Sequence, residues 1–203
     1  MKNLYSVYRE AIKSLTEAGC DSPEFDAQQL VSFCLGMNKT QLLLNSGSPI
    51  EEGKLFFFED CVKRRCNHEP LQYIIGMWDF HKFSFKVGEG VLIPRPETEI
   101  LVDYALDYLK GKENPVVFDL CSGSGCIGLT VARLNPSSKV YLVEKSPDAM
   151  KFLLENKNRF ALENVTVLNA TIEANKYVGG LAGRTCHVKN CAVKNSTVVA
   201  SDK

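Results

Sequence analysis

The sequence predicts an α/β protein in which a small all-helical N-terminal domain precedes a doubly wound parallel sheet. Three observations support this fold class. Apolar side chains recur at helical spacing through residues 1–70, beginning with a helix that ends near Gly19. Residues 79–93 contain a stretch in which apolar and polar side chains alternate, as in a hairpin. From Pro115 onward, short apolar runs alternate with helical segments, which is typical of parallel strands joined by crossover helices.

The helices of the N-terminal domain are bounded by capping and stop signals. Ser22-Pro23 and Ser48-Pro49 each place a capping residue before a proline, which is well tolerated at the first helical position. Gly36 ends the second helix, and residues 40–44 are expected to form only a short turn. Glu69-Pro70 ends the domain, because the residue before a proline avoids the helical conformation.

A β-hairpin linker is predicted over residues 71–96. The alternation in residues 83–87 indicates a half-buried strand, and the glycines of residues 88–90 indicate a turn. Residues 91–93 are expected to form the return strand, which the following prolines end.

A partial sheet domain is predicted over residues 97–172, and it opens with a helix that stops at Gly111. Its three apolar strands are expected at residues 116–120, 139–143 and 164–168. A sheet that ends at its third strand leaves the first strand as an exposed apolar edge. Residues 173–203 follow neither period, so we expect an irregular or disordered tail there.

Composition narrows the possible partners. The 203 residues include 24 Lys and Arg and 24 Asp and Glu, and this zero net charge gives no electrostatic reason to expect nucleic acid as a partner. No window approaches the ~20 apolar residues that cross a membrane. The first residues lack the pattern of a secretory signal, so we expect a cytoplasmic location, and we expect a monomer.

The eight cysteines give little reason to expect disulfides or a metal site. No pair has the C-x-x-C spacing of a zinc site, and buried cysteines behave as small apolar residues. Cys186, His187 and Cys191 offer only three candidate ligands in a polar tail, so no metal is predicted.

A Gly-rich loop between the first strand and its helix predicts a ligand site. Backbone N–H groups and a helix N-terminus meet there, and glycine permits close approach of a ligand. Glu144 ends the second strand, where a carboxylate can accept both ribose hydroxyls of an adenosine. The candidate cofactor-binding residues are Asp119, Cys121, Gly123, Ser124, Gly125, Glu144 and Lys145.

Two cofactor classes fit this loop. Residues 123–128 match the G-x-G-x-x-G fingerprint of dinucleotide sites, which would indicate a NAD(P)-dependent oxidoreductase fragment. The loop also matches the acid-x-small-x-Gly-x-Gly pattern of S-adenosylmethionine (SAM) enzymes. Asp119 favours SAM, because a carboxylate facing a pyrophosphate would be repelled.

Residues 69–76 together with residues 91–99, which read VLIPRPETE, resemble the HemK/PrmC family of SAM-dependent methyltransferases. That family methylates the glutamine of the GGQ motif in peptide chain release factors. The resemblance covers about residues 1–170 and implies a Rossmann-like methyltransferase sheet, a SAM cofactor and a release factor as protein substrate. It further implies that the substrate-side mouth is lined by Pro94, Arg95, Pro96 and Glu97.

The sequence departs from the family pattern at the catalytic signature. The family carries Asn-Pro-Pro-Tyr after its fourth strand, which orients the substrate amide, and these 203 residues contain no such segment. No catalytic residue is therefore identifiable, and we expect impaired or no methyl transfer from this chain. The family usually has an acid near the adenine just after the third strand, where this sequence has either Thr171 in its place or the acid displaced to Glu173. A truncated reading frame, a splice or frameshift product, or a decayed copy would each give a sheet that ends at its third strand.

A binding function is the alternative from a different class of protein. The helical domain would then retain contact with a release factor while the sheet domain is catalytically inert. Such a module would bind the release factor without methylating it.

Overall fold

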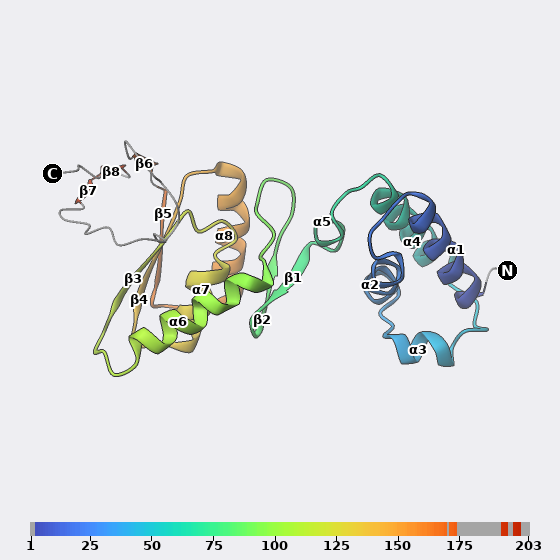
Figure 1. Ribbon diagram of the computed structural model, residues 1–203, viewed down its shortest axis with the longest axis horizontal. Coiled ribbons are helices and arrows are strands. Elements are labelled where there is room, and N and C mark those ends of the chain that lie inside the picture. The colour runs from blue at the N-terminus through green and yellow to red at the C-terminus, as the bar shows by residue number, and fades with distance from the viewer. Residues whose placement is uncertain (1–2, 170, 174–191, 195–196, 200–203) are drawn as a thin grey trace. The chain divides into compact units, whose positions relative to one another are not determined.

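The computed structural model describes residues 3–169, 171–173, 192–194 and 197–199 (Figure 1). The chain divides into two compact units, Met1–Gly76 and Met77–Lys203, which are treated separately below.

The N-terminal unit is helical within the part of the chain that the structure describes. Its helices are α1 (Leu4–Glu17), α2 (Pro23–Leu35), α3 (Lys39–Leu44), α4 (Glu52–Cys66) and α5 (Leu71–Ile75). Helix α1 begins where the Asn3 side chain accepts a hydrogen bond from the Ser6 amide, and α2 ends at Gly36 in the left-handed conformation.

Three sequence expectations for this unit differ from the structure. Ser48-Pro49 does not open a helix, because α4 begins only at Glu52, with Glu51 as its N-cap. Residues 40–44 are helical, because Asn38 and Gln41 form a capping box that closes the first turn of α3. Helix α5 contacts α2 and α4 and belongs to the N-terminal unit, whereas the sequence suggested a linker beginning at residue 71. The stop at Glu69-Pro70 is real, but the chain re-enters a helix directly after the proline.

The core of the N-terminal unit is apolar and crossed by one ion pair. Leu15, Leu30 and Phe58 are almost fully buried between α1, α2 and α4. Asp26 on α2 accepts a hydrogen bond of 2.8 Å from Arg65 on α4, and both side chains are largely buried. This pair fixes the two helices against one another, and the sequence pattern gave no signal for it.

The hairpin forms earlier in the chain than predicted. Strand β1 (Met77–Phe80) pairs antiparallel with β2 (Phe83–Lys86), with the turn at His81 and Lys82. His81 adopts a positive φ of 56°, a conformation in which histidine is enriched among non-glycine residues.

Residues 91–93 are not a return strand. Val91 instead closes a turn by donating its amide to the Gly88 carbonyl over 3.2 Å. Its side chain is buried beside Val87 and Ala149. An apolar residue such as Val91 is expected in a strand, but it is equally compatible with a turn whose side chain is buried against a helix.

The second unit contains the predicted parallel sheet. Strands β3 (Val116–Leu120), β4 (Lys139–Glu144) and β5 (Val165–Asn169) lie in the order β3-β4-β5 (Figure 1). They are joined by α7 (Cys126–Leu134) and α8 (Pro147–Phe160). The short 3-10 helix η1 (Pro96–Thr98) leads into α6 (Glu99–Leu109), which packs on α7. The α/β fold class predicted from the sequence is confirmed.

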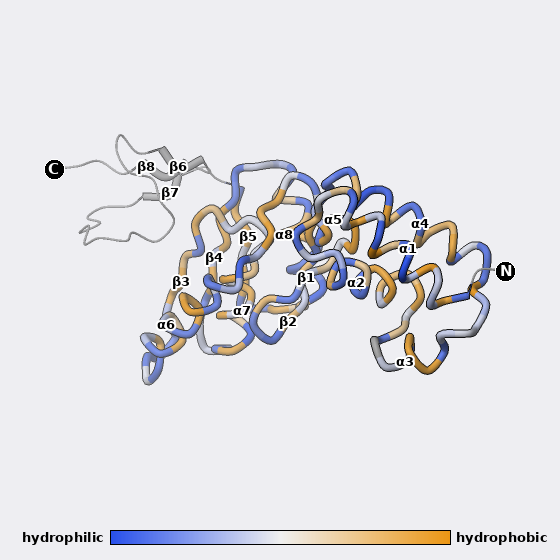
Figure 2. The backbone as a smooth tube through the Cα atoms, turned by 45° about the vertical axis from the view of Figure 1, so that its right-hand side comes forward, coloured by the Kyte–Doolittle hydropathy of each residue, from blue (hydrophilic) through white to orange (hydrophobic). Residues whose placement is uncertain are grey.

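The sheet has one covered face and one open edge. Leu129, Leu142 and Leu153 lie in the core beneath the helices, and Figure 2 shows apolar residues concentrated along the three strands. Strand β3 lies at the edge of this sheet, as predicted, with Val116 and Phe118 exposed. Phe118 stacks on Tyr141 of the neighbouring strand, with ring centroids 5.1 Å apart.

The C-terminal residues are described only in part. Strands β6 (Thr171–Glu173), β7 (Ala192–Lys194) and β8 (Thr197–Val199) form a separate sheet in the order β6-β8-β7. The predicted irregular tail and the cluster of Cys186, His187 and Cys191 otherwise lie outside the described residues. Within the described ranges, no helix is long and apolar enough to cross a membrane, and no metal-ligand cluster occurs.

Candidate ligand-binding loop

The Gly-rich loop follows the carboxyl end of β3 and opens helix α7. Gly123 and Gly125 both have positive φ values, of 57° and 79°, and Gly125 is the N-cap of α7. The Ser122 amide donates to the Val143 carbonyl over 3.0 Å, and the Ser122 hydroxyl donates to the Asp119 carbonyl over 2.7 Å. The loop is therefore tied to both neighbouring strands before any ligand arrives.

Asp119, near the end of β3, is hydrogen-bonded to the helix that follows the loop. Its Oδ2 atom accepts a hydrogen bond of 2.9 Å from the Gly128 amide in the first turn of α7. The carboxyl group is buried, and burial raises its pKa to about 6, with a smaller contribution from the charge of Glu144. This contact joins the end of β3 to the first turn of α7, beside the Gly-rich loop.

Glu144 connects the ends of β3 and β4. Its Oε2 atom accepts a hydrogen bond of 2.8 Å from the Gly123 amide, across the mouth of the loop. Its Oε1 atom accepts from the Lys145 and Ser146 amides, each over 2.8 Å. The two predicted halves of the site, the loop and the acid that ends β4, therefore lie in direct contact.

The other predicted loop residues play unequal parts. Cys121 is exposed and has a positive φ of 60°, which is unusual for a residue with a side chain. Ser124 is buried, and its carbonyl faces helix α8. Lys145 has an exposed side chain, and its recorded contact with Glu144 is made by its backbone amide.

Gly128, the third glycine of the G-x-G-x-x-G match, allows helix α7 to pack closely on the sheet below the loop. A Cβ atom at this position would lie 2.2 Å from Leu142 Cδ2 and 2.9 Å from Asp119 Oδ2. Helix α7 can approach β3 and β4 this closely only because residue 128 is a glycine. The G-x-G-x-x-G spacing contained this signal, since its third glycine serves helix and strand packing.

Asn156 was missed by the sequence analysis. Its side chain is fully buried on α8, where it accepts from the Lys86 amide over 2.7 Å and donates to the Lys86 carbonyl over 3.0 Å. It also donates to the Ser124 carbonyl over 2.9 Å. A single amide side chain thus joins the hairpin to the ligand loop.

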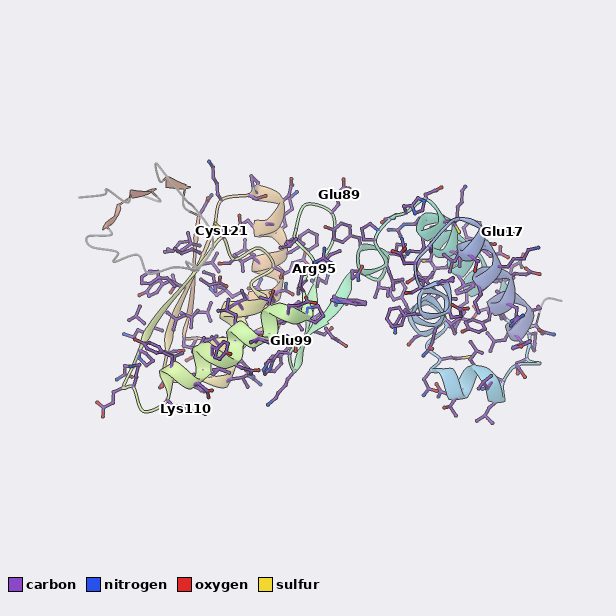
Figure 3. All side chains as sticks on the ribbon, in the orientation of Figure 1. Glu17, Glu89, Arg95, Glu99, Lys110 and Cys121 are labelled. Atoms are coloured by element: carbon purple, nitrogen blue, oxygen red, sulfur yellow. The ribbon has the colours of Figure 1, made fainter. Side chains whose placement is uncertain are left out.

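The predicted substrate-side segment lies in the same unit as the loop. Pro94 is buried, whereas Arg95, Pro96 and Glu97 are exposed where the chain enters η1 and α6; Figure 3 labels Arg95 there and Cys121 on the loop. Val91, three residues before Pro94, lies beside the loop: a Cβ atom on Gly123 would be 3.9 Å from Val91 Cγ2.

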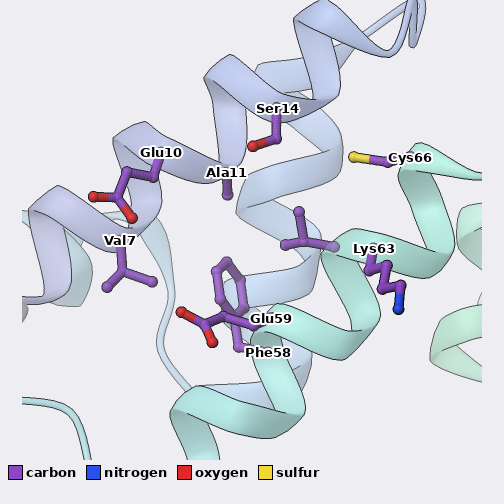
Figure 4. Close-up of a pocket in the computed structure, with 9 residues that line it drawn as sticks. Val7, Glu10, Ala11, Ser14, Phe58, Glu59, Lys63 and Cys66 are labelled. Atoms are coloured by element: carbon purple, nitrogen blue, oxygen red, sulfur yellow. The ribbon is translucent and has the colours of Figure 1, made fainter.

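A separate groove of about 340 Å³ lies on the N-terminal helices, between α1 and α4 (Figure 4). Val7, Ala11 and Phe58 provide apolar surface, and Glu10 and Glu59 provide carboxylates. The groove shares no lining residue with the ligand loop.

The fold and the loop define a class of protein. A parallel sheet with a Gly-rich turn after one strand and an acid after the next is the arrangement of proteins that bind an adenosine-containing cofactor. Comparison with known proteins narrows the class further.

Two family models match separate parts of the chain. The PrmC N-terminal domain matches residues 6–76, and rRNA small subunit methyltransferase G matches residues 99–188. Among solved structures, TYW2 of M. jannaschii in complex with AdoMet is 24% identical, with a TM-score of 0.39, covering 45% of this chain and 41% of that one.

Curated relatives are named release factor glutamine methyltransferase. The protein of Bifidobacterium longum is 40% identical over 160 residues, covering 76% of this chain and 54% of that protein. The protein of Fusobacterium nucleatum is 35% identical, covering 82% and 47%. The protein of Koribacter versatilis is 31% identical over 191 residues, covering 93% and 68%.

The chain belongs to the release factor glutamine methyltransferase family. It spans about half the length of the first two relatives named above.

Proposed function

We propose that this chain carries the SAM-binding half-site and the helical domain of a protein-glutamine N5-methyltransferase that acts on the GGQ glutamine of release factors. The observation that carries the proposal is the contact between the loop and the acid: Glu144 Oε2 lies 2.8 Å from the Gly123 amide. Family membership supports the reaction class, and the family model that matches residues 99–188 supports a methyltransferase over an oxidoreductase.

The hydrogen bonds of Glu144 fit a ribose with one local change. A carboxylate offers about four lone-pair positions, and three of those of Glu144 are used by backbone amides. One ribose hydroxyl can donate to the remaining position. A second hydroxyl can bind only if one amide releases Glu144. The Lys145 and Ser146 amides are held next to Glu144 by the chain itself, whereas the Gly123 amide comes from a distant part of the sequence. We therefore expect the Gly123 amide to be the group whose hydrogen bond changes when ligand binds.

SAM would supply an activated methyl group on a sulfonium. When bound, SAM would donate this methyl group to the amide nitrogen of the substrate, which would lose one proton. The described residues of this chain contribute binding and orientation: Asp119 aligns the start of α7, and Glu144 holds the ribose end.

The first experiment is isothermal titration of S-adenosylhomocysteine into the 203-residue chain. A second titration with NADH tests the oxidoreductase alternative. Binding of S-adenosylhomocysteine at micromolar concentration, without binding of NADH, is the expected result. Binding of NADH alone would favour the oxidoreductase fragment. A folded chain that binds neither ligand would contradict the proposed half-site.

Replacing Glu144→Gln tests the acid directly. The change removes the charge that the ribose hydroxyls bind, so affinity for S-adenosylhomocysteine should fall at least about tenfold, as for hydrogen bonds to charged groups. Glu163→Gln is the matched control, because Glu163 is exposed and follows α8 at the other end of β5. Equal affinity of both variants would exclude Glu144 from the site.

A release-factor-binding module is the second candidate function, because the PrmC N-terminal domain model matches the helical unit at residues 6–76. It predicts that the chain retains a release factor on an affinity column and transfers no methyl group from radiolabelled SAM. Methylation of the factor at a normal rate would exclude this alternative.

A further inference from the structure

We propose that Asn156 is a positioning residue that holds the Gly-rich loop in its ligand-binding shape by fastening it to strand β2. This inference rests on the proposed function, since it concerns the same ligand loop. It assigns a role to a residue that lies on helix α8, outside the loop and outside the acid that ends β4.

The hydrogen bonds of Asn156 use the whole of its side-chain amide. The Oδ1 atom accepts from the Lys86 amide, and the Nδ2 group donates to the carbonyls of Lys86 and Ser124. A primary amide has two N–H donors and an acceptor in one plane, so it pairs with a backbone peptide group and still reaches a second carbonyl. Aspartate lacks the donors, and leucine lacks both kinds of group.

The bond to Ser124 fixes the orientation of one peptide group in the loop. The peptide between Ser124 and Gly125 is planar. Its carbonyl accepts from Asn156 over 2.9 Å, and its N–H donates to the Ser122 carbonyl over 2.8 Å. With both ends bonded, this peptide cannot rotate without breaking a buried hydrogen bond, and Gly125 is the N-cap of α7.

Helix α8 makes further contacts that place the hairpin beside the loop. Phe152 lies against Gly88, where an added Cβ atom would meet its ring at 2.6 Å, and Phe160 stacks on Phe85 with centroids 5.0 Å apart. Val91 then reaches Gly123. Glu155 on α8 also pairs with Lys86 Nζ over 2.9 Å at the surface. Asn156 makes buried hydrogen bonds both to the hairpin and to the loop, so it couples the position of the hairpin to that of the loop.

The test compares Asn156→Leu with the wild-type chain at a temperature well below unfolding. We expect affinity for S-adenosylhomocysteine to fall at least about tenfold, because two loop and strand carbonyls lose their partner. We also expect the Gly125 amide resonance to move in the absence of ligand. Asn158→Leu is the matched control, because Asn158 is exposed on the same helix, and its affinity should stay within about twofold of wild type.

The outcomes separate a positioning role from a purely structural one. A variant Asn156→Leu that is folded and less stable, but has wild-type affinity and an unmoved Gly125 resonance, would overturn the proposal. If that variant does not fold, the wild-type chain decides: the assigned side-chain amide resonances of Asn156 should shift when S-adenosylhomocysteine binds. Unshifted resonances would overturn the proposal. Failure of the wild-type chain to bind would instead count against the proposed function.

Discussion

The helical N-terminal unit and the loop region of the second unit bury polar groups in different ways. In the N-terminal unit, Asp26 and Arg65 neutralise one another between two helices. In the loop region, Asp119, Glu144 and Asn156 are bonded to backbone amides and carbonyls. The first arrangement fixes how helices pack. The second fixes the backbone itself and leaves a carboxylate beside a glycine amide, which is what a ligand site needs.

Breaking the ion pair should have the largest effect. Asp26→Ala leaves Arg65 charged and largely buried, so we expect a loss of about 3 kcal/mol from the free energy of unfolding. The unfolding of the N-terminal helices can be followed by far-UV circular dichroism. Affinity for S-adenosylhomocysteine at low temperature should not change, and a changed affinity would contradict the separation of the two regions.

The matched control for this prediction is Glu17→Ala. Glu17 pairs with Lys13 over 3.8 Å, and both side chains are exposed. Exposed pairs of this kind contribute less than about 1 kcal/mol. A loss as large as that from Asp26→Ala would mean that burial does not distinguish the two pairs.

The pH dependence of stability tests the burial of Asp119. Burial raises the pKa of this carboxyl from its ordinary 3.8 to about 6. Between these values the folded state holds a proton that the unfolded state has released. The contribution of Asp119 to stability is therefore greatest below pH 4 and falls as the pH rises to 6, by about 3 kcal/mol.

Asp119→Asn should remove this fall, because asparagine stays neutral and can still accept from the Gly128 amide. Urea unfolding between pH 4 and pH 7 can be followed by the fluorescence of Trp78, which lies in the second unit. Asp107→Asn, an exposed position on α6, should keep the wild-type slope. A variant Asp119→Asn with the wild-type slope would contradict a raised pKa.

The two units also differ in how tightly a glycine within a helix is packed. Gly128→Ala places a methyl group 2.2 Å from Leu142 Cδ2, so we expect a loss of about 2 kcal/mol through overpacking. Gly53 in α4 has no atom within 4 Å of an added Cβ. Gly53→Ala should therefore stabilise its helix by up to about 1 kcal/mol. Urea unfolding monitored by Trp78 fluorescence and circular dichroism measures both, and effects of the same sign would contradict the packing argument.

The sequence by itself determined the elements whose signals are local. Ser22-Pro23 and Gly36 mark the ends of α2, and the three apolar runs mark β3, β4 and β5. The Gly-rich loop and Glu144 were found because a turn after one strand and an acid after the next meet at the same edge of a parallel sheet. These features depend on residue periodicity, on caps and on glycine, all of which act over a few residues.

Only the tertiary structure decided which groups satisfy one another across the chain. The hairpin turn at His81 and Lys82 follows from strand pairing, and Val91 is buried by α8. Asn156 meets Lys86 across 70 residues of sequence. The sequence shows no sign of that meeting, because an asparagine on a helix has the same local pattern whether it faces solvent or a buried backbone. Long-range packing decides which partner a buried polar group meets. It therefore also decided that Asn156 bonds to the Gly-rich loop.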